Sequence, residues 1–482
     1  MSLGSRRPGY YGHEADQPIS GGSAILRFLG VLAISDFIAA RLQMELSLGW
    51  HIVIACFGVG FPVLAVLAEW RWLRTGDEAY RLLALRWAKA LAVLFAVGAV
   101  SGTILSFEFG ILWPGLMGRF GDVIGLPFAL EGFAFFIEAI FLGIYLYGWD
   151  RLPPRVHLLT GVPVAIAGFA SAWFVVTANA WMQAPTGFRL VNGEAVDIDP
   201  WAAIFNPATP VLTTKMILAA YMVSGFGVAG VYAWGLLRGR RDRYHVVGFL
   251  LPFAFAAVMT PLQIVAGDWA ARHVAEYQPA KLAAMEGLFE TQRGAPLTIG
   301  GFPVGEEIVG GIEIPSGLSL LTERDPDAEI AGLDQVPRED WPVVWLTRTA
   351  FQIMVGIGFA LLALVGWFGW VWWRRRRLPR SRLFLWAAVA AGPAAVIAVE
   401  TGWIVTEVGR QPWVVYGVLR TADAFTAAEG LRFGFYALCG LYAVLTVATV
   451  FVLRLLARAP LPRVPATTQP DERAAVADGV TS

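Results

Sequence analysis

Nine long apolar segments run along the 482-residue chain, and they constrain its fold more than any other feature. A helix that crosses the roughly 30 Å of a bilayer's hydrocarbon core needs about 20 mostly apolar residues, and each segment has this length. Only 15% of the residues are charged, whereas a soluble domain carries about 25%. The sequence therefore predicts an all-α integral membrane protein with nine transmembrane helices. We expect them at 43–69, 89–112, 127–148, 158–182, 210–236, 246–267, 348–373, 383–407 and 430–457.

Positively charged residues are distributed unevenly between the two sides that these helices would connect. The connections after the first, third, fifth and seventh helices are rich in arginine, and the run 374–377 is the densest. The short connections on the other side hold only four basic residues, Arg119, Arg189, Arg410 and Arg420. Because basic connections stay in the cytoplasm, we expect the N-terminus outside and the C-terminus in the cytoplasm.

The helices and the segments around them define five parts of the chain. The stretch 24–42 mixes apolar residues with Arg27, Asp36 and Arg41, a pattern typical of a helix in the membrane interface. The long connection between the sixth and seventh helices shows no clear periodicity, but ordered loops of this length are commonly functional. The parts are an N-terminal extension with the interfacial amphipathic helix (1–42), helices 1–6 (43–267), an extracytoplasmic loop (268–347), helices 7–9 (348–457) and a disordered cytoplasmic tail (458–482).

Composition and motifs argue against several classes of function. The chain has 37 basic and 37 acidic residues, so its formal net charge is zero, and no basic field is available to bind nucleic acid. Its two cysteines, Cys56 and Cys439, lie in apolar runs, which argues against a disulfide framework and a thiolate metal site. No nucleophile elbow, phosphate-binding loop or HExxH motif is present, so hydrolytic and phosphoryl chemistry are disfavoured.

Ionisable and ligand-type side chains inside the apolar segments are candidate functional groups. A charge at the centre of a transmembrane helix costs at least about 2.5 kcal/mol, so such residues are retained for a reason. The predicted topology brings most of them toward the outer half of the membrane, with two carboxylates deeper. The set comprises His51, Glu108, Glu131, Glu138, Asn179, Lys215, Met354, Glu400 and Glu407.

Each of these residues also has a purely structural interpretation. His51 taken alone is equally a metal ligand or a hydrogen-bonded packing residue, and Met354 taken alone is typical of core packing. Glu131 and Glu138 are seven residues apart on one helix face, which suits a proton relay or a polar contact between helices. Glu407 could form an ion pair with Arg410 at a helix end. The convergence of His51 with Glu407 favours iron binding and proton transfer.

Five segments of the chain carry recognisable motifs. They are ARLQMELSLGWHI (40–52), GDVIGLPFALEGFAFFIEAIFLGIYLYGWDRL (121–152), TANAWMQAP (177–185), QPAKLAAMEG (278–287) and VETGWIVTEVGRQPW (399–413). Together they resemble subunit I of the cytochrome bd family of quinol oxidases over nearly the whole chain. The long outer loop resembles the family's short form of the quinol-binding loop.

The resemblance implies a haem-binding role for several residues. His51 and Glu407 would be the axial ligands of two high-spin haems, one haem b and one haem d, in an order that differs among family members. Trp403 and Arg410 would line this haem pair, and the arginine fork suits a haem propionate. Met354 matches the family's methionine ligand to a low-spin haem b.

The resemblance also implies where quinol and protons would bind. Lys281 and Glu286 match loop residues linked to quinol oxidation. Glu131, Glu138 and Glu108 would belong to the proton route toward the oxygen site. Glu108 is offset from the family's usual acidic position, which is Ser106 in this chain.

One departure concerns the low-spin haem. Lys215 stands where the histidine that pairs with Met354 is expected, and Gln352 stands where an arginine is common. A neutral lysine amine can bind iron, and burial lowers the pKa of lysine in the required direction. A lost haem or another ligand would explain the same change. The remaining histidines are poor substitutes: His157 and His245 fall on the predicted cytoplasmic side, and His273 lies in the outer connection.

The implied activity is that of a quinol:oxygen oxidoreductase. Quinol would be oxidised at the outer loop, and oxygen would be reduced to water with cytoplasmic protons, which generates proton motive force without pumping. The implied partners are a haem-free subunit II and a small single-helix subunit. Two alternatives remain: a divergent family member that lacks the low-spin haem and uses another electron donor, and a proton-coupled secondary transporter. The absence of inverted repeats in the sequence disfavours the transporter.

Overall fold

The computed structural model describes residues 34–375 and 381–460 of the chain. Within these residues it contains nine helices that are long and apolar enough to cross a membrane, which confirms the predicted fold class. They are α2 (Asp36–Thr75), α3 (Glu78–Leu112), α4 (Pro114–Tyr147), α5 (Pro154–Gln183), α7 (Thr209–Leu237), α8 (Arg243–Tyr277), α11 (Val344–Arg375), α12 (Arg382–Val408) and α14 (Leu431–Arg458).

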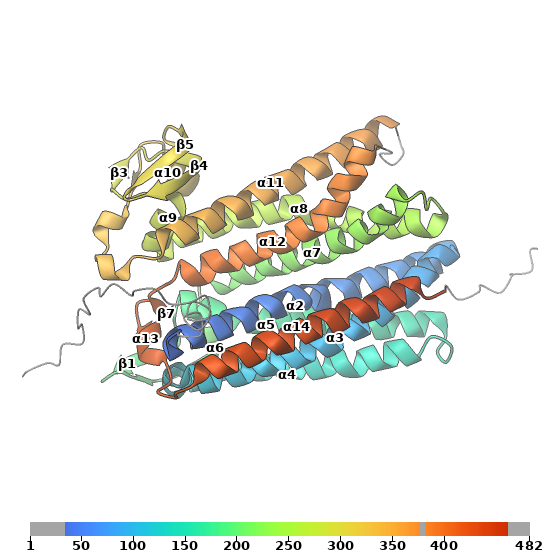
Figure 1. Ribbon diagram of the computed structural model, residues 1–482, viewed down its shortest axis with the longest axis horizontal. Coiled ribbons are helices and arrows are strands. Elements are labelled where there is room, and N and C mark those ends of the chain that lie inside the picture. Colours follow the sequence, from blue (N-terminus) through green and yellow to red (C-terminus); the bar gives the residue numbers. More distant parts are fainter. Residues whose placement is uncertain (1–33, 376–380, 461–482) are drawn as a thin grey trace, which may run out of the picture.

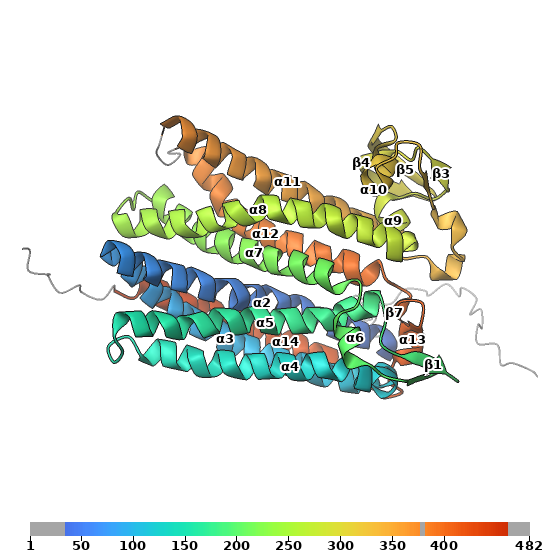
Figure 2. The same ribbon diagram turned by 180° about the vertical axis from the view of Figure 1, so that it is seen from behind.

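The nine helices lie side by side in two groups (Figure 1). One group contains α2, α3, α4, α5 and α14, and the other contains α7, α8, α11 and α12, an arrangement that is also visible from behind in Figure 2. Helix α7 joins the groups because it packs against α8 and α12 on one side and against α2 and α5 on the other. Since consecutive spans alternate in direction, the start of α2 and the end of α14 lie at opposite ends of the bundle.

The described helices extend beyond the predicted apolar spans because charged residues continue them outside the hydrophobic windows. Helix α2 begins at Asp36, after the N-cap Ser35, so residues 36–42 form its first turns and continue directly into the first span. The Asp36 carboxylate accepts hydrogen bonds from the backbone N–H groups of Gly430 and Arg432 at the start of α14. The rest of the expected interfacial helix (24–33) and most of the expected tail (461–482) lie outside the described residues.

The connection between α8 and α11 folds into a small unit, which we call the loop insertion (residues 278–343). Its centre is an antiparallel hairpin of β4 (Leu297–Val304) and β5 (Glu307–Ile314). The other elements of the insertion are α9 (Pro279–Glu286), β3 (Gln292–Arg293), α10 (Gly317–Glu323), β6 (Glu329–Ile330) and the 3-10 turns η1 (Leu333–Gln335) and η2 (Arg338–Asp340). Sequence periodicity had indicated no regular elements here, because the hairpin strands contain glycines and expose many side chains on both faces.

We call the end of the bundle that carries the loop insertion the loop end, and the other the basic end (Figure 1). Further short elements lie at the loop end. They are β1 (Arg189–Val191), β2 (Glu194–Val196), α6 (Pro200–Ile204), β7 (Trp413–Val415), β8 (Leu419–Arg420) and α13 (Thr421–Ala424).

Close packing between α2 and α7 holds the two groups together. The Ser224 hydroxyl on α7 donates a hydrogen bond to the Cys56 carbonyl on α2 at 2.8 Å. A Cβ atom placed on Gly60 would lie 2.4 Å from Ser224 Oγ, so only glycine permits this approach. Small residues at helix crossings are the usual means by which membrane helices gain contact area.

We therefore expect Gly60→Ala to destabilise the bundle. Overpacking a tight contact costs about 1–3 kcal/mol, so the apparent Tm of the purified complex should fall by several degrees. Gly143→Ala is the matched control, because a Cβ at Gly143 meets nothing within 4 Å and alanine favours helix. Equal Tm values for the two variants would contradict this account of the α2–α7 contact.

Candidate functional site

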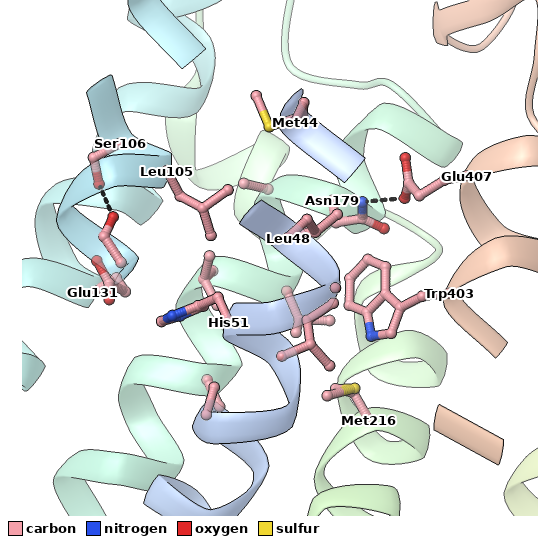
Figure 3. Close-up of a pocket in the computed structure, with 18 of the residues that line it drawn as sticks. Met44, Leu48, His51, Leu105, Ser106, Glu131, Asn179, Met216, Trp403 and Glu407 are labelled. Carbon is pink, nitrogen blue, oxygen red and sulfur yellow. Dashed lines mark hydrogen bonds between the residues drawn. The ribbon is translucent and has the colours of Figure 1, made fainter. Parts of the chain in front are cut away.

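A cavity of about 620 Å³ lies among α2, α3, α4, α5, α7 and α12. Its size falls within the range of about 300–1,000 Å³ that is typical of ligand sites. In the view of Figure 3, His51 points from α2 toward the side where Glu131 lies, and Trp403, Asn179 and Glu407 lie on the other side of that helix. The predicted site residues in its lining are His51, Glu131, Glu138, Asn179, Glu400, Trp403, Glu407 and Arg410.

A hydrogen bond between α2 and α3 orients the side chain of His51. His51 Nδ1 lies 2.8 Å from Ser101 Oγ, and the Ser101 hydroxyl also contacts the carbonyl oxygens of Val97 and Gly98. In the tautomer in which Nδ1 donates to Ser101, the lone pair of Nε2 is free to bind a metal. A Cβ at Gly102 would lie 3.2 Å from the ring, so this glycine provides room beside the imidazole.

Glu407 is held by two donors at the loop end of α12. Asn179 Nδ2 donates to Glu407 Oε1 at 2.7 Å, and Arg410 Nη2 donates to Oε2 at 2.5 Å. The ion pair that the sequence suggested as an alternative therefore forms, but within the cavity wall. Arg410 is only 3% exposed, and its Nη1 has no partner among the described residues. This buried guanidinium can bind a further anionic group.

The three predicted proton-route glutamates do not share one environment. Glu131 and Glu138 both line the cavity, and Ser171 donates a hydrogen bond to Glu131. Glu108 is buried but is not part of the lining: its Oε1 accepts a hydrogen bond from Ser47 at 3.0 Å. Ser106 lines the cavity instead. The structure thus separates Glu108 from the other two carboxylates.

Met354 and Lys215 lie outside the lining of this cavity, and only Met216, the neighbour of Lys215, contributes to it. A Cβ placed on Gly402 of α12 would lie 3.1 Å from the Met354 sulfur, so α11 and α12 are in contact at this level. Gln352 is bound to the loop insertion, because its side chain accepts from Gly300 N and donates to the Thr298 carbonyl.

Lys281 and Glu286 lie together on the short helix α9 at the loop end. Lys281 Nζ donates to Gln183 Oε1 at 2.6 Å, and Gln183 is the last residue of α5. Burial, together with the nearby Arg410 cation, holds the pKa of Lys281 well below its usual range. Burial also raises the pKa of Glu286 from 4.5 to about 7, although the Arg348 guanidinium acts in the opposite direction.

Sequence reasoning missed Arg348, which is completely buried near the start of α11. Its guanidinium donates to four backbone carbonyls: those of Met285 and Glu286 in α9, and those of Thr298 and Gly300 in β4. An arginine at a membrane boundary is unremarkable in a sequence, so no signal identified it. Glu45 was also missed. It is exposed and lines the cavity, and its place within the 40–52 motif was an available signal.

The remaining histidines lie outside the cavity lining, as expected. His157 is bonded to Glu69 near the basic end, and His245 is bonded to Asp242 at the start of α8. His273 stacks on Tyr277 near the end of α8.

Comparison with known proteins identifies the family. The model of the cytochrome bd terminal oxidase subunit I family matches residues 39–460. The chain belongs to this family. A Bacillus subtilis (strain 168) relative, provisionally named cytochrome bd menaquinol oxidase subunit I, is 39% identical over 429 residues, which cover 87% of this chain and 96% of the relative. The cytochrome bd ubiquinol oxidase subunit 1 of the same strain is 32% identical over 437 residues, which cover 87% and 93%.

A solved structure supports the same assignment. The bd oxidase from Geobacillus thermodenitrificans matches with 40% identity and a TM-score of 0.83, over 88% of this chain and 98% of that one. The resemblance inferred from the motifs is therefore confirmed. A bd-family chain is part of a membrane-bound oxidoreductase and uses haem cofactors.

The cavity of this bd-family chain fits haem in three respects. His51 lines the cavity, and imidazole is a common iron ligand. Arg410 Nη1 is a buried donor without a partner, which suits a propionate. The wall of the cavity is mostly apolar and aromatic, and includes Phe95, Phe109 and Trp403, as flat macrocycles require.

The raised pKa of Glu286 predicts a pH-dependent stability. In the folded chain Glu286 keeps its proton up to about pH 7 instead of 4.5, so the folded state holds an extra proton between these values. Its contribution to the free energy of unfolding is therefore complete below about pH 4.5 and falls as the pH rises through about 7. Tm measured from pH 5 to pH 7.5 should fall less steeply in Glu286→Gln than in the wild type. Glu290→Gln, which changes an exposed carboxylate of the same insertion, should keep the wild-type slope.

Proposed function

We propose that the chain is the haem-bearing subunit I of a cytochrome bd-type quinol oxidase that oxidises membrane quinol and reduces oxygen to water. The observation that carries this proposal is the placement of His51, Glu407 and Arg410 around one cavity. An imidazole nitrogen and a carboxylate are both known types of iron ligand. Family membership indicates the class of reaction, and the cavity is where we expect the haems to bind.

The donor arrangement supports two high-spin haems in this cavity, one haem b and one haem d. His51 would hold one of them from α2, and Glu407 would hold the other from α12. When bound, the haem irons supply the electron transfer and oxygen chemistry. The protein holds Glu407 between Asn179 and Arg410, so this carboxylate keeps one orientation. Trp403 lines the same space.

The loop insertion is the proposed site of quinol oxidation. Quinol releases two protons as it gives up two electrons, so a group that can accept a proton must lie near it. Lys281, with its lowered pKa, is such a group and is held by Gln183 at the end of α5. Glu286 lies five residues further, at the end of α9, and its Oε2 has no hydrogen-bond partner among the described residues. The Arg348 guanidinium binds the backbone carbonyl of Glu286.

Protons for oxygen reduction would enter from the opposite side. Glu138 and Glu131 line the cavity one above the other on α4, and Ser171 fixes the outer one. The basic end would face the cytoplasm, because arginines flank the helices there. Quinol protons leave at the loop end and substrate protons arrive from the basic end, so turnover separates charge without a pump. Glu108 would contribute only through its contact with α2.

The assembly we propose is that of the family. Subunit II would pack against this chain in a prokaryotic plasma membrane, and a small single-helix subunit would complete the complex. The low-spin haem b is the variable part, because Lys215 replaces the expected histidine. If Lys215 and Met354 together hold a haem iron, the chain would accept electrons from quinol; if they do not, it would accept electrons from another donor.

The test is a haem count on the purified complex, with a dithionite-reduced minus oxidised spectrum and quinol-dependent oxygen uptake. Three haems with quinol-dependent uptake support the full proposal. Two high-spin haems without quinol activity would retain the oxygen site but remove quinol as donor. A colourless complex that consumes no oxygen would overturn the proposal.

Lys215 gives a sharper prediction. If its amine is an iron ligand, Lys215→Ala should abolish the low-spin b signal and reduce quinol oxidation at least about tenfold, while the two high-spin signals persist. Lys215→His should restore a low-spin signal, because histidine is a common haem ligand. Thr214→Ala, at the exposed neighbouring position, should leave all three signals unchanged. An unchanged spectrum in Lys215→Ala would show that the lysine is not a ligand.

A further inference from the structure

A second polar site, separate from the cavity, lies toward the basic end between α2, α4 and α5. His157 Nδ1 lies 2.7 Å from Glu69 Oε1, and His157 Nε2 lies 2.8 Å from the Tyr145 carbonyl oxygen. The histidine is 2% exposed and the glutamate is fully buried. The Tyr145 and Trp149 rings lie 4.6 Å and 4.2 Å from the imidazole, centroid to centroid.

The hydrogen bonds fix the proton content of this pair. A backbone carbonyl can only accept, so His157 Nε2 must be protonated. The contact between Nδ1 and Glu69 Oε1 then holds one more proton, either on the imidazole or on the carboxyl group. In both cases the pair as a whole is neutral. Glu69 Oε2 has no hydrogen-bond partner among the described residues, so it is the position where a further proton can bind.

An adjoining space of about 180 Å³ connects this pair with polar groups nearer the basic end. Water occupies about 30 Å³ per molecule, so the space has room for several. Trp149 and Glu78 line it, and neither Trp149 Nε1 nor Glu78 Oε2 has a hydrogen-bond partner among the described residues, although Glu78 Oε2 forms an ion pair with Arg81. A buried water needs two to four polar partners, and these groups together with Glu69 Oε2 can provide them. The space is suited to a water cluster.

A polar column leads from this site toward the large cavity. Tyr145, Glu138 and Glu131 are spaced by seven residues on α4 and therefore share one face. Gly161 and Gly168 of α5 lie against it, since Cβ atoms there would lie 3.0 Å from the Tyr145 ring and 3.4 Å from Glu138 Oε1. These glycines leave space for polar side chains between α4 and α5.

We propose that Glu69 and His157 form a proton-loading site at the basic end that feeds Glu138 through the Tyr145 hydroxyl. This inference rests on the proposed function, because it supplies the protons consumed in oxygen reduction. A purely structural pair would need neither an adjoining space for water nor an unpartnered buried carboxylate oxygen. A desolvated acceptor left without a partner destabilises the fold, and a role in proton transfer would explain why this one is retained.

The proton steps balance without any further reactant. A proton from the water cluster binds Glu69 Oε2, and the pair changes from neutral to singly positive. The proton on Glu69 Oε2 then passes through an intervening water to the Tyr145 hydroxyl oxygen, since neither atom has a hydrogen-bond partner among the described residues. The hydroxyl passes its own proton on, so Tyr145 is unchanged. The Tyr145 side chain leans toward the N-terminus of α4, as helical side chains do, and this direction leads to Glu138.

Water must complete the last step. Seven residues of helix span about 10 Å, more than one hydrogen bond. The buried Leu142 lies between the two levels on the same face, which separates the loaded proton from the cavity until water enters. Glu138 Oε1, which has no partner among the described residues, is the acceptor on the cavity side.

The experiment measures proton uptake from the basic-end side when the fully reduced complex, in oriented proteoliposomes, reacts with oxygen. Glu69→Gln keeps the shape of the side chain but prevents loading, and should slow uptake at least about tenfold. Asp150→Asn is the control: it removes an exposed carboxylate that follows α4 and lies outside the lining of this space, so its uptake should match the wild type. Wild-type uptake in Glu69→Gln, or equal slowing in both variants, would overturn the proposal.

Tyr145→Phe tests the same route independently, in case Glu69→Gln does not fold. It keeps the ring that stacks on His157 and removes only the hydroxyl, so haem content and Tm should match the wild type while proton uptake slows. Unchanged uptake in this variant overturns the route. Failure of the proposed function is distinguishable, because a wild-type complex without haem or oxygen consumption would contradict it irrespective of Glu69.

Discussion

The arrangement of this chain depends on one constraint: a charge that is removed from water must find a partner inside the protein. Glu407 meets this requirement through Asn179 and Arg410, which brings the loop ends of α5 and α12 together. Arg348 meets it through four backbone carbonyls. In a bilayer, apolar contacts alone do not determine the relative positions of helices. These polar contacts fix them. The geometry of the cavity is therefore a consequence of satisfied charges.

The sequence predicted the number, order and alternating direction of the membrane helices because length and hydropathy decide them locally. Helix ends were less predictable. Asp36 suggested an interfacial segment, yet its carboxylate caps the start of α14, a contact between residues almost four hundred positions apart. The hairpin β4–β5 was not predicted, because its glycines and exposed strands give no alternating pattern. Long-range contacts and irregular strands have no local sequence signal.

The functional site likewise contains residues that the sequence predicts and residues that only the fold reveals. His51 and Glu407 were predicted from charge, depth and motif, and both line the cavity. Glu108 is also a carboxylate within an apolar segment, but its side chain binds Ser47 instead of lining the cavity. Successive residues of a helix point in directions about 100° apart, so a small offset in sequence places a side chain on another face. Arg348 and the pair of Glu69 with His157 could not be predicted, since their importance lies in partners from other helices. Residue type indicates chemistry, whereas the fold decides which residues can exercise it.

The attachment of the loop insertion to α11 has a mechanical consequence. Arg348 and Gln352, one helical turn apart, both bind the backbone of β4, and Met354 follows two residues later on the same helix. These contacts therefore couple the movement of the hairpin to that of the start of α11. A molecule that displaces the hairpin must either break these backbone contacts or turn the helix with it. Events at the water-exposed surface are in this way transmitted to the membrane interior at the level of Met354.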